Sequence, residues 1–197
     1  ADMGEGKRHD LSEIGRIGHF QLGQLPNDYQ PVLSHTRRYR LQDSPYIYTN
    51  GIHGAYIEVD IDTGWINHLN HWVVEDCGRI INEQLADEQI RGGCVQGLGG
   101  ALYEHYIYDD FGQLQNGTMV DYVTPMMSEM PDITVGHVQT PTSESELGAK
   151  GAGESGTGAA PGVMMNAVNN AIKPLTDGRV TEQPISPEVI LKALGKL

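Results

Sequence analysis

The sequence predicts an α+β fold, in which mixed β-sheets are crossed by helices. Two observations favour this class. Apolar and polar residues alternate on both sides of a turn near residue 62, which indicates a β-hairpin, and two later segments carry apolar residues at helical spacing. Further strand-like segments are interleaved with these helices, as is typical of mixed-sheet α+β domains. The length of 197 residues suits one domain or slightly more.

The first quarter of the chain shows no sustained hydrophobic period. Three prolines and the basic run Arg37–Arg40 interrupt residues 1–50, and only a short helix is expected, near Leu11–Ile17. The pattern predicts an extended arm or linker over residues 1–50 and a folded domain over residues 51–197. Because such an arm is unusual inside a compact domain, we expect it to lie on another chain or domain.

The hairpin is predicted from two alternating runs. Ala55, Ile57 and Val59 alternate with polar or exposed neighbours, Asp62–Gly64 has the composition of a turn, and Trp65–Glu75 reads as the returning strand. The sequence therefore places two antiparallel strands at the start of the folded domain.

The histidines and cysteines predict no metal site. His68 and His71 are three residues apart, which puts them on opposite faces of a regular strand and argues against a shared metal ion. The chain has only Cys77 and Cys94, too few for a four-thiolate zinc site or an iron–sulfur cluster. We expect both cysteines to be buried free thiols.

A helix is predicted from Asn82, a suitable N-cap, to about His105. Its apolar residues form one stripe: Ile90, Cys94, Leu98, Ala101 and Leu102. The glycines within it cost about 1 kcal/mol each relative to alanine, so tight packing or a ligand must offset them. The later elements follow from the same patterns: short strand Tyr106–Tyr108, turn Asp109–Gly112, strand Ile133–Thr140, loop Pro141–Gly158, helix Ala160–Ile172, strand Val180–Ile185 and a short helix opened by Ser186–Glu188.

The composition excludes several classes of function. The 26 acidic and 13 basic side chains give a formal charge of −13, which argues against binding to nucleic acid or to anionic lipid. No stretch reaches the ~20 apolar residues of a membrane span. The polar first residues show no signal peptide, so we expect a cytoplasmic protein, with the periplasm left open because a removed signal would leave the same picture.

Glycine is frequent and clustered. It accounts for 25 of 197 residues, against a usual ~7%. One group lies between Gly92 and Gly100, and the other between Gly148 and Gly158. Clustered glycines occur where the backbone approaches something closely or takes a positive φ. Two such places suggest a large ligand held by the main chain.

The second glycine group, Gly148–Thr157, precedes a helix and contains one carboxylate. A nucleotide phosphate loop would require lysine at the position of Glu154, and a carboxylate there would repel phosphate. Alternatively, backbone amides and the helix start hold an anionic cofactor while Glu154 acts as a base. The structural alternative is a glutamate stabilised by the helix dipole.

Gly148–Thr157 resembles the glycine–glutamate loop of the molybdenum hydroxylases, the xanthine oxidase and aldehyde oxidase family. Four further segments resemble that family in the same order: His53–Gly64 its hairpin, Glu75–Asn82 its Asp-x-Gly-Arg-x-x-Asn turn, Gln89–Glu104 its glycine-rich helix, and Pro184–Leu194 its closing strand and helix. The resemblance covers about residues 46–197. It implies that residues 51–197 are the C-terminal lobe of a molybdenum-cofactor-binding domain.

The resemblance also implies roles for single residues. Glu154 matches the catalytic glutamate, the general base that deprotonates the oxygen nucleophile. Gln89 matches a glutamine near the molybdenum oxo group or the pterin. The remaining matches are to backbone or side-chain contacts with the cofactor: Gln96, Gly97, Lys150, Gly151, Ala152 and Gly153. The family's molybdenum has no protein side-chain ligand, so none is expected here.

The implied activity is the oxidative hydroxylation of an aldehyde or an aza-aromatic carbon, with water as the oxygen source. The implied cofactor is molybdenum–molybdopterin, with the cytosine dinucleotide form left open. A 2Fe-2S subunit, a FAD subunit and the rest of the large subunit are the expected partners, and the chain should be inactive without them. We expect either a fragment or a separately encoded piece of a split subunit. The alternative is a non-catalytic structural or assembly subunit that retains the fold.

Overall fold

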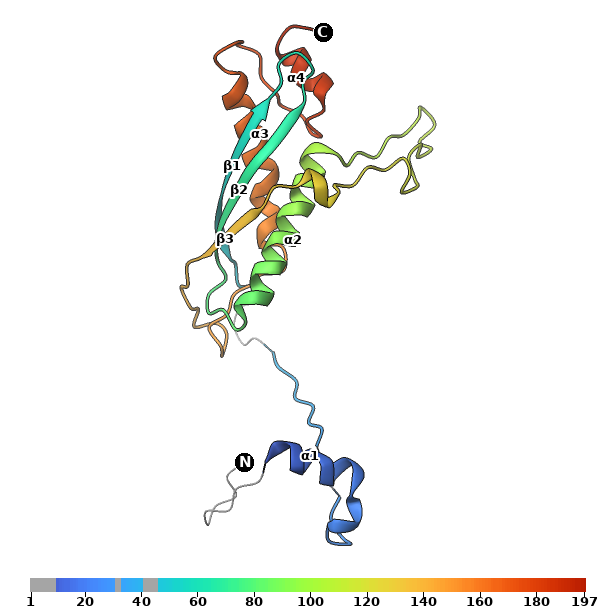
Figure 1. Cartoon of the computed structure of the whole chain (residues 1–197), viewed down its shortest axis with the longest axis vertical. Coiled ribbons are helices and arrows are strands. Elements are labelled where there is room, and N and C mark those ends of the chain that lie inside the picture. Colours follow the sequence, from blue (N-terminus) through green and yellow to red (C-terminus); the bar gives the residue numbers. More distant parts are fainter. Residues whose placement is uncertain (1–9, 31–32, 41–45) are drawn as a thin grey trace. The chain divides into compact units, whose positions relative to one another are not determined.

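The computed structural model describes residues 10–30, 33–40 and 46–197 and divides the chain into two units, residues 1–40 and 41–197 (Figure 1). Parts of the predicted arm, at residues 1–9, 31–32 and 41–45, lie outside the described residues. No helix in the described ranges is both long and apolar enough to cross a membrane.

The first unit contains the helix α1 (Leu11–Phe20) and a 3-10 turn, η1 (Leu22–Gln24). The Asp10 carboxylate accepts a hydrogen bond from the Ser12 amide at 3.0 Å and so caps α1. The expected short helix is confirmed and extends three residues further than Ile17.

The second unit is built on a three-stranded mixed sheet. Strands β1 (Asn50–Val59) and β2 (Ile66–Asp76) form the expected antiparallel hairpin, and β3 (Ile133–His137) lies parallel to β2 at its other edge. The helices of this unit are α2 (Glu83–Leu102), α3 (Ser155–Ile172) and α4 (Pro187–Ala193), with a 3-10 turn η2 (Met127–Glu129). The predicted α+β class with a mixed sheet is confirmed.

One face of the sheet packs on α2 and α3, and Figure 1 shows these two long helices lying side by side. Val73 of β2 packs with Ile90 and Cys94 of α2. The second and larger cluster joins the two long helices to the C-terminal segment: Leu98, Ala101, Ala160, Met164, Val168, Ile172, Val180, Ile185 and Ile190. The apolar stripe predicted for the first long helix is therefore its core face.

A β-bulge in β2 changes which side chains face the helices. Tyr56 pairs with Asn70 and Ile57 pairs with His68, so Leu69 has no partner on β1. One extra residue shifts the two-residue period of the strand by one position. His68 and His71 consequently lie on the same buried face, and the prediction that they lie on opposite faces was wrong.

The two glycine groups allow α2 and α3 to pack closely. A Cβ on Gly97 would lie 2.7 Å from the Thr157 carbonyl oxygen and 2.9 Å from the Ala160 Cβ. A Cβ on Gly156 would collide with the Ile90 carbonyl oxygen. At Gly97 and Gly156, the close backbone approach that the glycines predicted is the contact between α2 and α3.

Two predicted strands are not formed. Tyr106–Tyr108 contributes only an isolated bridge from Tyr108 to Leu114, and Val180–Ile185 has no strand partner. The Asn169 side chain instead hydrogen-bonds to both backbone groups of Val180. It accepts from the Val180 N–H and donates to the Val180 carbonyl, each at 2.9 Å. A side chain from α3 thus makes the hydrogen bonds to Val180 that a neighbouring strand would have made.

The helix packing predicts opposite effects for two glycines of α2. Gly97→Ala should destabilise the protein by about 1–3 kcal/mol, because its new methyl group meets backbone that has to move. Gly92→Ala is the matched control: nothing lies within 4 Å of its added Cβ, so alanine should be neutral or stabilising by up to about 1 kcal/mol. Denaturant unfolding of both variants measures the difference, and equal stabilities would contradict the packing argument.

Candidate functional site

The glycine–glutamate loop is anchored to the end of β2. The Lys150 amide donates to the Cys77 carbonyl at 2.8 Å, and the Arg79 amide donates to the Gly148 carbonyl at 3.0 Å. Gly148 has a φ of +73°, in the left-handed region that favours glycine. The loop therefore turns sharply at Gly148 and follows the end of the strand before it enters α3.

A network of largely buried polar side chains holds the loop in this position. The Lys150 ammonium lies 3.1 Å from an Asp76 carboxylate oxygen and donates to the Thr140 hydroxyl oxygen at 2.7 Å. The Thr140 hydroxyl also donates a very short hydrogen bond to Asp76, and the Gly78 amide donates to the same carboxylate at 3.0 Å. The Lys150 side chain is thus bonded within the protein. A ligand at this loop would therefore contact the backbone of Lys150 rather than its side chain.

The hydrogen bonds from Thr140 are the main reason that the pKa of Asp76 lies far below its usual value of 3.8; the contact with Lys150 adds to them. The carboxylate is therefore ionised at neutral pH. The sequence analysis did not single out Asp76 or Thr140. The available signal was the position of Asp76 in the segment Glu75–Asn82, which resembles the Asp-x-Gly-Arg-x-x-Asn turn.

Gln89 connects α2 to the loop. Its side-chain amide donates a hydrogen bond to the Gly153 carbonyl at 2.7 Å, across 64 residues of sequence. The structure therefore brings together Gln89 and the residue that precedes Glu154. Gln89 and Glu154, two of the site residues inferred from the resemblance, therefore lie near one another, where the first turns of α2 face the start of α3.

Glu154 is the N-cap residue of α3, but its side chain does not cap the helix. The residue is exposed, and only its backbone carbonyl accepts a hydrogen bond, from the Thr157 amide at 3.1 Å. The positive end of the helix dipole favours a negative charge at this position. The structure thus presents an outward-facing carboxylate rather than one consumed by a cap.

The glycines beside Glu154 leave the backbone open. Nothing lies within 4 Å of a Cβ added to Gly153, and an added Cβ on Gly151 would meet only the Ile47 carbonyl, at 3.6 Å. Ala152 between them turns partly inward, against the cluster around Val73. A planar or anionic group can therefore reach the main chain of residues 151–153 without a side chain in its path.

The two remaining candidates differ from each other. Gln96 is exposed, and its side-chain oxygen accepts a 3.4 Å hydrogen bond from the Thr157 hydroxyl, so it lies on the same edge as the start of α3. Gly97 is buried beneath α3. The contacts that Gly97 makes in this chain are packing contacts.

Comparison with known proteins identifies relatives of this arrangement. Residues 6–131 match the family model described as the molybdopterin cofactor-binding domain. The matched stretch includes most of the segment predicted to be an arm and ends before the glycine–glutamate loop.

The chain is 36% identical over 187 residues to the nicotine 6-hydroxylase large subunit of Paenarthrobacter nicotinovorans, covering 94% of this chain and 22% of that protein. It is 32% identical over 150 residues to the aldehyde oxidoreductase of Megalodesulfovibrio gigas, covering 75% of this chain and 16% of that protein. The solved quinoline 2-oxidoreductase of Pseudomonas putida 86 superimposes with a TM-score of 0.77 at 35% identity, over 95% of this chain and 24% of that one. The chain spans about a fifth of the length of these relatives.

The loop network predicts a pH-dependent effect of Asp76→Asn. A carboxyl whose pKa is lower in the folded than in the unfolded state stabilises the fold above its unfolded pKa and loses that contribution as the pH falls through the folded value. We therefore expect Asp76→Asn to lower the unfolding temperature at pH 7, with the deficit shrinking as the pH falls below 3.8. Asp110→Asn, an exposed change of equal charge, controls for net charge. A deficit that does not vary with pH would contradict the assignment.

Proposed function

The chain belongs to the molybdopterin cofactor-binding family of the molybdenum hydroxylases, and we propose that it supplies the C-terminal, base-bearing lobe of the catalytic subunit. The observation that carries this proposal is the conjunction of Glu154, exposed at the start of α3, with Gln89 bonded to the neighbouring Gly153. Residues 51–197 form that lobe in this proposal, and residues 1–50 reach across the rest of the subunit.

The residues present fit a pterin cofactor. The open main chain at Gly151 and Gly153 and the amide-rich start of α3 suit an anionic, hydrogen-bonding group. An exposed row on α2 continues this surface: Gln89, Gly92, Gln96 and Gly100 recur at helical spacing, and nothing lies within 4 Å of an added Cβ on either glycine. In this proposal the backbone of Lys150–Gly153, with Gln89 and Gln96, holds the cofactor.

When bound, the molybdenum–pterin group would supply the two-electron oxidation and the activated oxygen. The chain's own contribution is proton transfer. The Glu154 carboxylate accepts the proton of the oxygen nucleophile on one of its oxygens. Because Glu154 makes no capping bond, it can turn toward the reacting atoms at no cost to α3.

Gln89 positions this base. Its 2.7 Å bond to the Gly153 carbonyl fixes the residue immediately before Glu154 relative to α2. The same side chain retains its amide oxygen, which can accept a further hydrogen bond from the cofactor or from water. Gln89 thus links the orientation of the base to that of the cofactor surface.

We propose an aza-aromatic ring carbon as the site of hydroxylation. Two relatives that each match more than nine-tenths of this chain carry nicotine and quinoline in their names. The aldehyde oxidoreductase matches a smaller share, 75%. An aldehyde substrate is therefore the second candidate.

The outer face of the hairpin carries exposed apolar residues, which supports the proposal that this lobe works together with further protein. Ile52, Tyr56 and Trp72 project from it with 70%, 60% and 42% of their surface exposed. A row of large apolar residues on a soluble domain marks an interaction site. We propose that the rest of the large subunit covers this face, and that iron–sulfur and flavin subunits complete the electron path, as the relatives' description as subunits of complexes suggests. A purely structural subunit would not require an exposed carboxylate between glycines.

The first test is Glu154→Gln in the assembled enzyme. The amide keeps the size of the side chain but cannot accept the proton, so turnover should fall by about 10²–10⁴-fold. Molybdenum and pterin contents should be unchanged. Glu144→Gln, at an exposed position of the same loop, should retain the wild-type rate. A fully loaded Glu154→Gln enzyme with near-normal turnover would leave only the structural role of this glutamate.

The second test is Gln89→Ala. Loss of its bond to Gly153 should lower kcat by roughly ten- to a hundredfold, equivalent to about 1–3 kcal/mol, with cofactor content and unfolding temperature largely retained. Gln84→Ala, at an exposed position one turn earlier on α2, is the matched control. Equal kcat values for the two variants at saturating substrate would refute the positioning role.

A further inference from the structure

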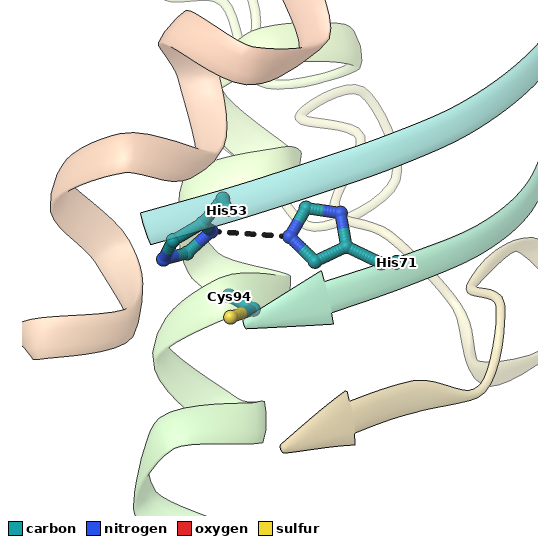
Figure 2. Close-up of side chains that lie close together, drawn as sticks. All are labelled: His53, His71 and Cys94. Atoms are coloured by element: carbon teal, nitrogen blue, oxygen red, sulfur yellow. Dashed lines mark hydrogen bonds between the residues drawn. The ribbon is translucent and has the colours of Figure 1, made fainter. Parts of the chain in front are cut away.

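Three potential metal ligands meet between the hairpin and α2. His53 of β1, His71 of β2 and Cys94 of α2 point toward a common centre (Figure 2). One ring nitrogen of each histidine and the Cys94 Sγ all lie within 4.8 Å of one another. His71 and Cys94 are fully buried, and the His53 side chain is 1% exposed. The proposed hydroxylation chemistry uses none of these residues.

The surroundings of this cluster are polar and incompletely satisfied. Both oxygens of Glu75, the His53 Nε2 and the His68 Nδ1 are buried without a hydrogen-bond partner among the described residues. The Glu75 carboxylate is 1% exposed, and one of its oxygens lies 3.4 Å from the His53 Nε2. A buried carboxylate with no hydrogen bond and one distant ion-pair partner is costly, and a cation bound nearby would lower that cost.

We propose that His53, His71 and Cys94 bind a zinc ion within this lobe. In tetrahedral zinc sites, Zn–N bonds of 2.0–2.1 Å place two nitrogens about 3.3 Å apart. The His53 Nδ1 and His71 Nε2 are 3.1 Å apart. The ligand atoms lie within 4.8 Å of one another, so the Cys94 sulfur needs to approach by about 1.2 Å at most to reach the ~3.6 Å expected between nitrogen and thiolate ligands. A water completes the tetrahedron, and Cys94 loses its proton to solvent on binding.

The residues around the ligands form the supporting layer that a zinc site requires. Ligating histidines generally present their second nitrogen to a carboxylate or another acceptor, which fixes the ring orientation. Glu75 lies 3.4 Å from the second nitrogen of His53, and the His68 Nε2 lies 3.4 Å from the second nitrogen of His71. The charges also balance, since Zn²⁺ compensates the Cys94 thiolate and the Glu75 carboxylate.

Two features of the fold build this layer. The bulge at Leu69 turns His68 to the same face as His71. Gly51 pairs with Glu75 across the hairpin, and an added Cβ there would collide with the Glu75 carboxylate, so the glycine leaves room for it. The alternative to a metal site is a metal-free polar cluster in which His53 pairs with Glu75.

Measuring the zinc content of the intact protein that contains this chain distinguishes a zinc site from a metal-free polar cluster. Because the ligands are enclosed, zinc must enter during folding, so the protein is produced in zinc-supplemented medium without a histidine tag. We expect about one zinc per chain. Zinc-edge X-ray absorption should show one sulfur at about 2.3 Å and nitrogens at about 2.0–2.1 Å. The measurement is specific for zinc, so molybdenum and iron in the enzyme do not interfere.

The cysteines provide a matched pair of variants. Cys94→Ser should lower bound zinc by about tenfold or more and remove the sulfur signal, because a serine hydroxyl is a poor zinc ligand. Cys77→Ser should retain both, since Cys77 is equally buried but lies beside Thr49, outside the cluster. Glu154→Gln should also retain the zinc, so this test does not depend on the proposed function.

Three results would overturn the zinc site. One is wild-type protein with less than about a tenth of a zinc per chain after production with zinc. Another is bound zinc without a sulfur ligand, which indicates an adventitious ion. The third is a folded Cys94→Ser variant with undiminished zinc. The first two use only wild-type protein and remain decisive if the variant does not fold.

Discussion

The close packing of α2 against α3 is the contact on which the rest of the lobe depends. It requires that Gly93 and Gly97 on one helix and Gly156 on the other have no side chains, because any Cβ there meets the opposing helix. With the helices in contact, the start of α3 lies beside the first turns of α2. The bond between Gln89 and Gly153, and hence the position of Glu154, follows from that approach.

The two faces of α2 lie in different chemical environments. Gln89, Gly92 and Gln96 lie on its exposed side, where the open backbone of the loop continues the surface. Ile90, Cys94 and Leu98 lie on the buried side, four residues apart, against the sheet and α3. Helical periodicity thus separates the proposed cofactor surface from the histidine–cysteine cluster by the width of one helix.

Order in the glycine–glutamate loop comes from outside it. The loop has few side chains of its own to pack, and glycine loses more conformational freedom on folding than other residues. Its fixed points are the Cys77 carbonyl, the Asp76 carboxylate and the Thr140 hydroxyl, all at the ends of strands or just beyond them. The loop can therefore expose main chain to a ligand and still keep one geometry, which supports a base that must be placed before reaction.

Local chemistry made much of this protein predictable from its sequence. The Asn82 side chain caps α2 and the Ser186 hydroxyl caps α4, as their positions before helical patterns indicated. The hairpin, the buried stripe of α2 and the glycine-flanked Glu154 are likewise properties of short segments. Each depends on neighbours within a few residues, whose preferences the sequence displays directly.

Long-range contacts decided the remainder. Strand alternation predicted His68 and His71 on opposite faces, but pairing with β1 leaves Leu69 out of register and turns both rings inward. Val180–Ile185 was predicted to be a strand, but Asn169 satisfies the backbone of Val180 instead. His53, His71 and Cys94 are separated by 18 and 23 residues along the chain and gain their common centre only when two strands and a helix pack together. Spacing in sequence cannot show such a cluster, because the distances that define it exist only across elements.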